Sequence, residues 1–295
     1  MEKIKKIDIH AHLNVYPQYD FGIGVTVEQL LGLYEGLEVE KSVLLPIVSP
    51  EGQLLKFDNY DAISVVEQYP DKFEWFCNVD PRSVDNSEKS DFSKMLTMYK
   101  DKGAKGVGEM TSNIYVDDPK MDNLFSYLEE YQMPLLFHMS PRLGFNYGMV
   151  DDLGMPRLEK MLKKHKKLKF IGHSQPFWAE MSGDLTEDQR NGFPTTKVVT
   201  GRITKLMREY DNLYCDISAN SGRNAFMRDR EHAISFLTEF SDRIFYGCDI
   251  CGMGNPIHLM FKEFLDGLAE SGELKFEDYK KICRDNAIKL LNLDK

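Results

Sequence analysis

Short apolar runs alternate with longer amphipathic stretches along almost the whole chain. The first run covers residues 7–12, and seven more begin near residues 41, 73, 105, 134, 168, 212 and 243. Their starts lie 29 to 44 residues apart, a spacing typical of units made of one strand and one helix. The pattern therefore predicts eight strands, each followed by a helical segment.

The stretches between the runs carry apolar residues at helical spacing. Residues 26–38, 119–131 and 156–167 are the clearest examples. The pair Asp118-Pro119 is a typical helix start, because proline fits the first turn, where its missing N–H is not needed. The lysine-rich side of 156–167 is expected to be a solvated helix face rather than a binding patch.

Near-continuous apolar strands that alternate with helices indicate a parallel sheet covered on both faces. Eight such units predict an α/β fold, a (β/α)8 TIM barrel that forms a single domain over residues 1–295. A doubly wound open sheet is the alternative, but no Gly-x-Gly-x-x-Gly follows a strand. The longest connection, 174–197, follows the sixth run, and long irregular loops in compact domains are usually functional.

Composition narrows the classes of partner. A net charge of −10 argues against nucleic acid, whose binding needs a basic surface. A small-molecule substrate, even an anionic one, is compatible with this net charge, because positive charges near the site can outweigh the average negative field of the protein. No apolar run is long enough to cross a membrane or to act as a signal region, so we expect no membrane association and a cytoplasmic location. A homodimer is compatible with a barrel of this size.

The five cysteines are odd in number and fit reduced thiols in a cytosolic protein. Cys248 and Cys251 have a Cys-x-x-Cys spacing, which could serve redox or zinc chemistry. No second pair exists to complete a four-cysteine zinc site, which argues against that interpretation.

Side chains that can bind metals stand at the ends of five of the eight runs. They are His10 and His12 in the first run, Glu109 in the fourth, His138 in the fifth, His173 in the sixth and Asp249 in the eighth. Alternation along the first strand is expected to place Asp8, His10 and His12 on one face. Since the carboxyl ends of barrel strands meet at one mouth, these imidazoles and carboxylates predict a divalent metal site there.

The order Asp8-x-His10-x-His12, followed by His138, His173 and Asp249, resembles the amidohydrolase superfamily of metal-dependent barrels. Within it, the chain is similar to the amidohydrolase-related group that includes aminocarboxymuconate semialdehyde decarboxylase and various lactonases. The resemblance spans nearly the whole chain, and it is specific for the metal site rather than for a substrate.

The resemblance implies two ways of using the site. In a one-metal arrangement, which we consider first, His173 would contact the attacking water or the substrate, and the ligands would be His10, His12, His138 and Asp249. In a two-metal arrangement His138 and His173 would hold the second ion and Glu109 would bridge the two. Members that bridge with a carbamylated lysine differ, because the nearest lysine, Lys105, lies four residues before Glu109. Nitrogen and oxygen ligands favour zinc and also admit Mn, Fe or Co.

Such a site suits hydrolysis. A bound divalent ion lowers the pKa of its water to about 7 and polarises a carbonyl. Asp249 would accept the proton of the water and pass it to the leaving group. The predicted activity is metal-dependent hydrolysis of a small amide, ester or lactone, with a carboxylated substrate expected.

Four residues are candidate substrate contacts. Arg142 follows the fifth run and Arg223 follows the seventh, where either could grip a carboxylate. Phe177 and Trp178 begin the long connection and could wall an apolar pocket. The alternatives are ordinary surface arginines and packing of the loop on the barrel.

Three other functions compete with hydrolysis. Non-oxidative decarboxylation is the alternative that the resemblance implies, but the residues around Asp249 do not resemble the Gly-x-Asp-aromatic-Pro stretch of many decarboxylases. A metal-binding barrel without catalysis conflicts with the intact ligand set. A nuclease of the TatD kind conflicts with the negative charge.

Overall fold

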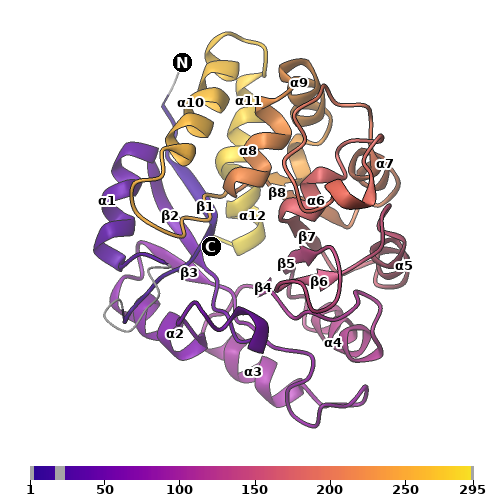
Figure 1. Ribbon diagram of the computed structural model, residues 1–295. Coiled ribbons are helices and arrows are strands. Elements are labelled where there is room, and N and C mark those ends of the chain that lie inside the picture. The colour runs from indigo at the N-terminus through magenta and orange to yellow at the C-terminus, as the bar shows by residue number, and fades with distance from the viewer. Residues whose placement is uncertain (1–2, 17–23, 294–295) are drawn as a thin grey trace.

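The computed structural model describes residues 3–16 and 24–293, and it shows a ring of strands surrounded by helices (Figure 1). The expected domain, 1–295, thus reaches slightly beyond the described residues at both ends. The strands are β1 (Lys6–Ala11), β2 (Val39–Leu44), β3 (Phe73–Trp75), β4 (Val107–Met110), β5 (Leu135–Ser140), β6 (Met149–Val150), β7 (Phe170–His173), β8 (Leu213–Asp216) and β9 (Ile244–Phe245). The eight predicted strands are all present. The additional β6 pairs with the end of β5 and is only two residues long, too short to give an alternating pattern.

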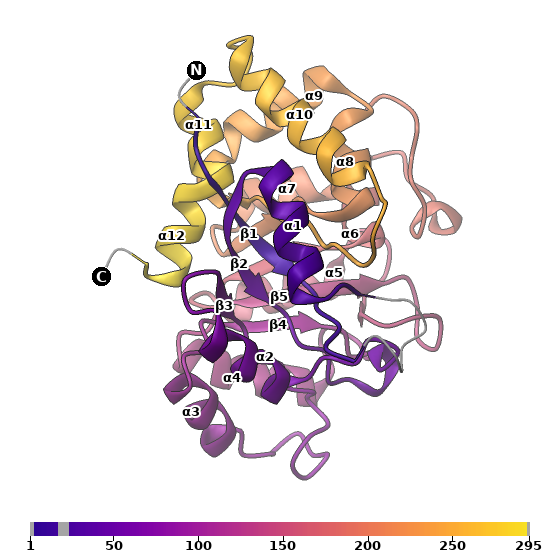
Figure 2. The same ribbon diagram turned by 90° about the vertical axis from the view of Figure 1, so that its left-hand side faces the viewer.

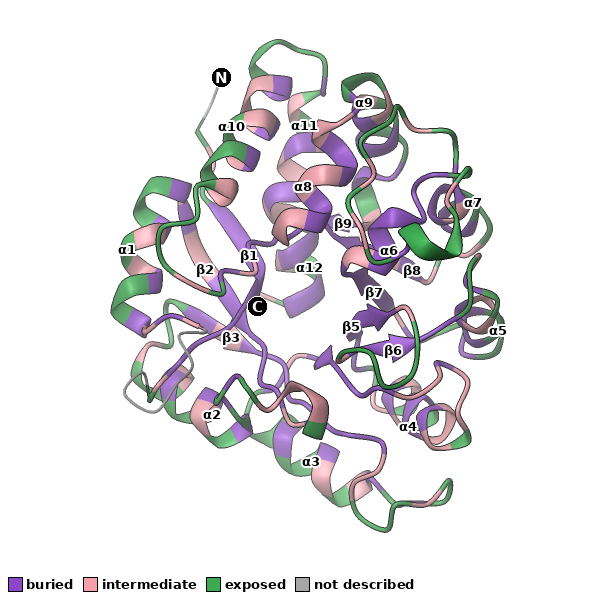
Figure 3. Ribbon diagram, in the orientation of Figure 1, coloured by how far each residue is buried: buried purple, intermediate pink, exposed green. Residues whose placement is uncertain are grey.

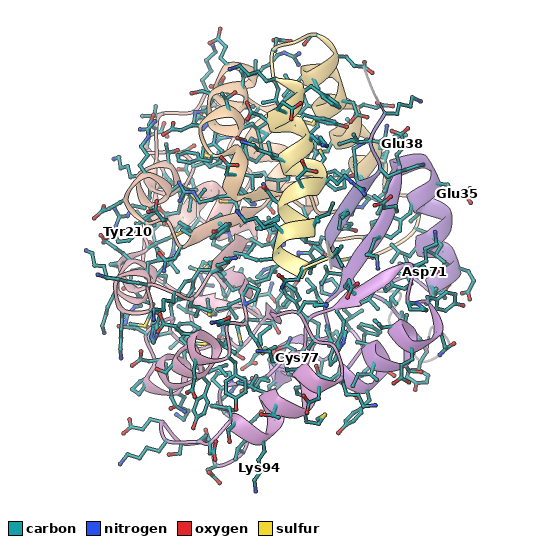
Figure 4. The ribbon with its side chains drawn as sticks, turned by 180° about the vertical axis from the view of Figure 1, so that it is seen from behind. Glu35, Glu38, Asp71, Cys77, Lys94 and Tyr210 are labelled. Atoms are coloured by element: carbon teal, nitrogen blue, oxygen red, sulfur yellow. The ribbon has the colours of Figure 1, made fainter. Side chains whose placement is uncertain are left out.

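All strand pairs are parallel, in the orders β1-β2-β3 and β4-β5-β7-β8-β9. Cys77, labelled in Figure 4, joins the two groups: its N–H donates to Gly106 O and its carbonyl accepts from Gly108 N, both at 2.9 Å. At the other seam Ile9 N donates to Tyr246 O at 3.1 Å, which ties β1 to the residues after β9. The ring is closed, and the predicted single-domain TIM barrel is confirmed.

Helices cover the outside of the ring. They are α1 (Val27–Leu37), α2 (Asn59–Gln68), α3 (Ser93–Asp101), α4 (Pro119–Glu130), α5 (Pro156–Lys164), α6 (Gln175–Ala179), α7 (Arg202–Glu209), α8 (Ala219–Met227), α9 (Arg230–Glu239), α10 (Ile257–Glu270), α11 (Phe276–Lys280) and α12 (Asn286–Leu291). The expected helices 26–38, 119–131 and 156–167 correspond to α1, α4 and α5. Figure 3 shows buried strands inside and helices that are buried on one side and exposed on the other, as amphipathic sequences require.

Apolar side chains fill the barrel at the end where the strands begin. The cluster includes Ile7, Val43, Leu136, Ile171 and Phe245, and α12 adds Ala287, Leu290 and Leu291 to it. In Figure 2 and, from behind, in Figure 4, α12 lies across this end of the barrel. Because this end is closed by apolar packing, polar side chains gather at the opposite end, where the strands finish.

Two further features bear on the expectations from sequence. No helix in the described part of the chain is long and apolar enough to cross a bilayer. The two thiols of the Cys-x-x-Cys pair have different neighbours: Cys248 Sγ lies 3.6 Å from Tyr246 Oη, and Cys251 Sγ lies 3.1 Å from Asp249 Oδ1.

Candidate metal centre

Six side chains that were singled out in the sequence come together at the ends of the strands. Their ligand atoms form three groups, each with all atoms within 4.8 Å of one another. The groups are His10, His173 and Asp249; His10, His12 and Glu109; and Glu109, His138 and His173. Every expected metal ligand therefore lies in one cluster, and five of the six are buried.

His10 of β1 and His12, just after the end of that strand, face each other through their Nε2 atoms, which lie 3.0 Å apart. Each ring is oriented by its other nitrogen, since His12 Nδ1 lies 2.8 Å from Leu45 O and His10 Nδ1 lies 2.6 Å from Asp216 Oδ2. Fixing one ring nitrogen by a carbonyl or carboxylate is the usual way in which a protein prepares the other for a metal.

Asp8 does not share this face, contrary to the expectation from strict alternation. Its Oδ2 accepts a hydrogen bond from Tyr34 Oη of α1 at 2.6 Å, and its Oδ1 accepts from Cys248 N at 2.8 Å. The physical reason is a register shift in the pairing of β1 with β2 between Asp8 and Ala11. Burial raises the pKa of Asp8 to about 6, although these hydrogen bonds oppose the rise.

Glu109, at the end of β4, connects the two halves of the cluster. Its Oε2 lies 3.3 Å from His12 Nε2, and its Oε1 lies 2.7 Å from His138 Nδ1 and 4.0 Å from His173 Nε2. Burial alone would raise the pKa of this carboxyl, but the neighbouring His138 and His12 hold it well below its ordinary value. The carboxylate can therefore offer one oxygen to each side.

His138 is held in place by the segment that follows β5. The ring of Tyr147 lies against it at a centroid distance of 4.6 Å. Gly148 passes so close that an added Cβ would stand 2.9 Å from His138 Cδ2, and its φ of +112° suits glycine. A side chain at position 148 would displace the histidine ring.

Asp216, at the end of β8, is a member of the site that the sequence reasoning did not single out. In addition to its contact with His10 Nδ1, Asp216 Oδ2 accepts a hydrogen bond from Ser218 Oγ at 2.8 Å and lies 3.3 Å from His173 Nδ1. Burial would raise the pKa of Asp216, but the charge of His10 and the hydrogen bonds from both histidines lower it to about 2. The available signal was its place near the end of the seventh expected strand, like the other members of the site.

Asp249 follows β9 in the left-handed region, with φ of +53°. Its N–H donates to His10 O at 2.8 Å, and its Oδ2 lies 3.4 Å from His173 Nε2. Burial would raise the pKa of Asp249, but the charges of His10 and His173 outweigh it and keep the group ionised. Its side chain is 15% exposed, the most accessible carboxylate of the cluster.

A cavity of about 150 Å³ opens beside the cluster. Its lining includes four of the expected ligands, His12, Glu109, His138 and Asp249. The other lining residues are apolar or polar: Ile47, Leu54, Leu55, Tyr147, Cys251, Gly52, Glu51, Thr111 and Asn146. His173 is buried and is not among the residues that line this cavity.

The four expected substrate contacts lie elsewhere. Arg142 is exposed and stacks on Phe145 at 4.5 Å, and Arg223 Nε donates to Asn220 Oδ1 at 2.9 Å. Phe177 and Trp178 are buried in α6, and Trp178 Nε1 donates to Asp216 O. None of the four lines the cavity. For Phe177 and Trp178 the reason is that the connection 174–197 begins with a helix that packs on the barrel instead of forming an open loop.

The donor set fits a divalent ion. Four imidazoles and two carboxylates supply the nitrogen and oxygen atoms that zinc, manganese, iron and cobalt accept. Lys105 lies away from the cluster, with Nζ 3.9 Å from Glu74 Oε2, so a carboxylated lysine does not complete it.

Comparisons with known proteins agree with this architecture. A family model described as amidohydrolase matches residues 7–293. No curated protein matches the sequence. Among solved structures, an uncharacterised TIM-barrel protein from Bordetella bronchiseptica has a TM-score of 0.67 and 19% identity, with 98% of this chain and 99% of that chain covered.

Two similar structures have names that state an activity. A dihydroxybenzoic acid decarboxylase from Polaromonas sp., with bound manganese and the inhibitor 2-nitroresorcinol, has a TM-score of 0.64 and 14% identity over 99% of this chain and 98% of its own. A probable 2-pyrone-4,6-dicarboxylic acid hydrolase from Acinetobacter baumannii has a TM-score of 0.59 and 14% identity over 98% and 100%. At these identities the likeness establishes the fold alone.

Proposed function

The chain belongs to the amidohydrolase family, and from that premise we propose that it is a metal-dependent hydrolase of a small amide, ester or lactone. The proposal includes zinc as the ion, a small-molecule substrate and a cytoplasmic location. A homodimer is also part of it. Manganese is the competing ion, because a similar fold binds it.

The observation that carries the proposal is the position of Glu109. Its two oxygens face different histidines, His12 on one side and His138 on the other. This geometry suits a bridge between two ions better than the one-metal arrangement of His10, His12, His138 and Asp249, in which Glu109 is not a ligand. We therefore place two ions first, which reverses the preference drawn from the sequence.

The chain's own residues then have distinct tasks. His10, His12 and Asp249 would hold one ion, and His138 and His173 the other. Ions in such a set supply an acidic water near neutral pH and polarise a carbonyl. Asp249 lines the cavity, so its carboxylate can take the proton from the attacking water and return it to the leaving oxygen or nitrogen.

Metal stoichiometry tests the two-ion arrangement. Protein purified without added metal should contain about two ions per chain, and Glu109→Gln should reduce this to about one, since an amide is a poor bridge. Glu51→Gln, which changes a carboxylate outside the ligand groups, is the matched control and should keep two. One ion in both wild type and Glu109→Gln would overturn the bridge.

Decarboxylation is the second candidate, since a similar fold with bound manganese belongs to a decarboxylase. The two reactions release different products from their substrates. Acid release from a panel of lactones and esters, followed by titration, should be detectable with the metal-loaded protein and absent with His10→Ala. Carbon dioxide release from hydroxybenzoates without acid release from any lactone or ester would replace the hydrolase proposal with the decarboxylase.

A further inference from the structure

Arg190 is a buried arginine that the proposed mechanism does not use. It belongs to the long connection 174–197, and its side chain is fully buried. Its Nη1 donates to Pro141 O and to Glu187 Oε1, each at 3.1 Å, whereas its Nε and Nη2 have no hydrogen-bond partner among the described residues. Its Nε lies 3.7 Å from Oε1 of Glu180, which is also buried. Since a buried charge is costly unless it is paired, these contacts fix the place of the guanidinium.

The carbonyl that Arg190 holds begins the segment 141–148, which connects β5 to β6. Most of this segment is exposed, so its position depends on the hydrogen bonds at its two ends. At the far end, Asn113 Nδ2 donates to Gly148 O at 3.2 Å. At the near end, the bond from Arg190 to Pro141 O ties the segment to the long connection.

The end of this segment determines how the ring of His138 is oriented. The other histidines of the cluster each have one ring nitrogen within 3.0 Å of an oxygen outside the proposed ligands. His138 lacks such a partner: its Nδ1 faces the proposed ligand Glu109, and its Nε2 has no hydrogen-bond partner among the described residues. Its ring is held by packing instead, against Tyr147 at a centroid distance of 4.6 Å and against the backbone of Gly148.

We propose that Arg190 is a positioning residue for the metal centre. By holding Pro141 O it fixes the segment 141–148, and this segment orients the ring of His138. The inference rests on the metal site of the proposed function but not on the number of ions, because His138 is a ligand in both the one-metal and the two-metal arrangement. The connection 174–197 then has a role at the site although none of its residues lines the cavity.

Cobalt binding tests this role without any substrate. Cobalt is an ion that the donor set accepts, and its visible absorption depends on the geometry of its ligands. Arg190→Met should raise the dissociation constant of cobalt at least about ten-fold, measured by competition with a chelator, because a displaced His138 binds less well. The visible spectrum of the cobalt-loaded variant should also differ from that of the wild type.

Arg228→Met is the matched control. Arg228 holds the same connection through Thr196 O and Ser182 Oγ, at 3.0 and 2.8 Å, and neither acceptor belongs to the segment 141–148. This variant should keep the wild-type cobalt affinity and spectrum. Equal changes in Arg190→Met and Arg228→Met would show that the connection acts only through general stability, and they would overturn the proposal.

A second pair of variants covers a failure to fold. Arg190→Met leaves Glu180 buried without its cation, whereas the double variant Glu180→Gln/Arg190→Met removes both charges of the pair. Glu180→Gln alone is the reference for the double variant, with the same two readouts. Unchanged affinity and spectrum in a folded Arg190 variant would overturn the positioning role. Absence of cobalt binding in the wild type would overturn the metal site itself, and failure to hydrolyse any lactone or ester with the cobalt results as expected would count against the hydrolase alone.

Discussion

Asp216 is placed to orient two of the proposed metal ligands without being a ligand itself. It contacts the Nδ1 atoms of His10 and His173, at 2.6 and 3.3 Å, so that both Nε2 atoms turn toward the cluster. Such partners fix the tautomer and orientation of the ligands and raise their basicity. We therefore regard Asp216 as a positioning residue.

Asp216→Asn should weaken metal binding by about ten- to a hundred-fold, because an amide holds the two imidazoles less firmly. Competition with a chromogenic chelator measures this affinity directly. Asp151→Asn, which changes a buried carboxylate at the start of α5, is the control and should keep the wild-type affinity. Unchanged affinity in Asp216→Asn would remove Asp216 from the site.

At the scale of elements, α6 serves packing. Phe177 lies at 6.0 Å from the ring of Phe137 and at 5.2 Å from that of Trp178. It also occupies the space beside Gly172, where an added Cβ would stand 2.1 Å from its ring. The short helix thus secures the chain directly after His173.

Phe177→Ala should lower the free energy of unfolding by about 3 to 5 kcal/mol, the usual cost of a cavity left by a buried phenylalanine. Urea denaturation measures the change. Phe145→Ala, at a position 43% exposed, is the matched control and should cost less than about 1 kcal/mol. A small cost in Phe177→Ala, together with a loss of lactone and ester hydrolysis, would support the earlier assignment of Phe177 to the substrate pocket.

The start of α5 should make stability depend on pH. Burial raises the pKa of Asp151 from 3.8 to about 6, although the N–H groups of Leu158, Arg157 and Asp152 oppose the rise. Between these values the unfolded chain loses the proton that the folded chain keeps. The contribution of this group therefore falls by up to about 3 kcal/mol as the pH rises from about 4 to 6, and it stays low above that.

Asp151→Asn should remove this fall. The amide cannot accept from Leu158 N as the carboxyl group does, so a loss of about 1 kcal/mol is expected at pH 4, and it should reverse by pH 7 because only the wild type loses stability as Asp151 titrates. Urea denaturation of wild type and variant at several pH values from 4 to 7 gives the difference between the two curves. Parallel curves would show that Asp151 titrates at its ordinary pKa in the folded protein.

At the scale of the whole molecule, a bound metal ion should stabilise the folded barrel. The proposed ligands come from β1 and the residue after it, from β4, β5 and β7, and from the segment after β9, so an ion held by them would connect strands from across the ring. Free zinc at a hundred times its dissociation constant should stabilise the fold by about 2.7 kcal/mol. Thermal unfolding with zinc and with chelator measures the shift, and His10→Ala should respond much less. Equal unfolding temperatures in both conditions would exclude a metal that binds only the folded state.

The barrel could be predicted from sequence because buried parallel strands are apolar throughout and recur at a regular spacing. The same regularity placed His138, His173 and Asp249 at strand ends. Eight strand–helix units predicted a closed ring, but they did not identify the residues that close it. Closure depends on hydrogen bonds such as the one from Ile9 N to Tyr246 O. A single sequence carries no direct signal for such pairing between its two ends.

The sequence did not predict in which direction each side chain points, and this limited how well the site could be predicted. Asp8 turns to Tyr34 because of a register shift, which alternation cannot reveal. Phe177 and Trp178 pack inward because the segment after β7 becomes helical, while its glycine and acidic residues suggested an open loop. Asp216 stood at a strand end like the others, so the rule that found them also applies to it.

Closure between the two ends of the chain has a consequence for synthesis. His10 and His12 leave the ribosome before the rest of the barrel, whereas Asp249 and the partner of Ile9 follow only after most of the barrel strands have been made. A nascent chain therefore carries an incomplete set of donors that holds an ion weakly. Firm retention of metal then distinguishes a finished polypeptide from one whose translation stopped before residue 249.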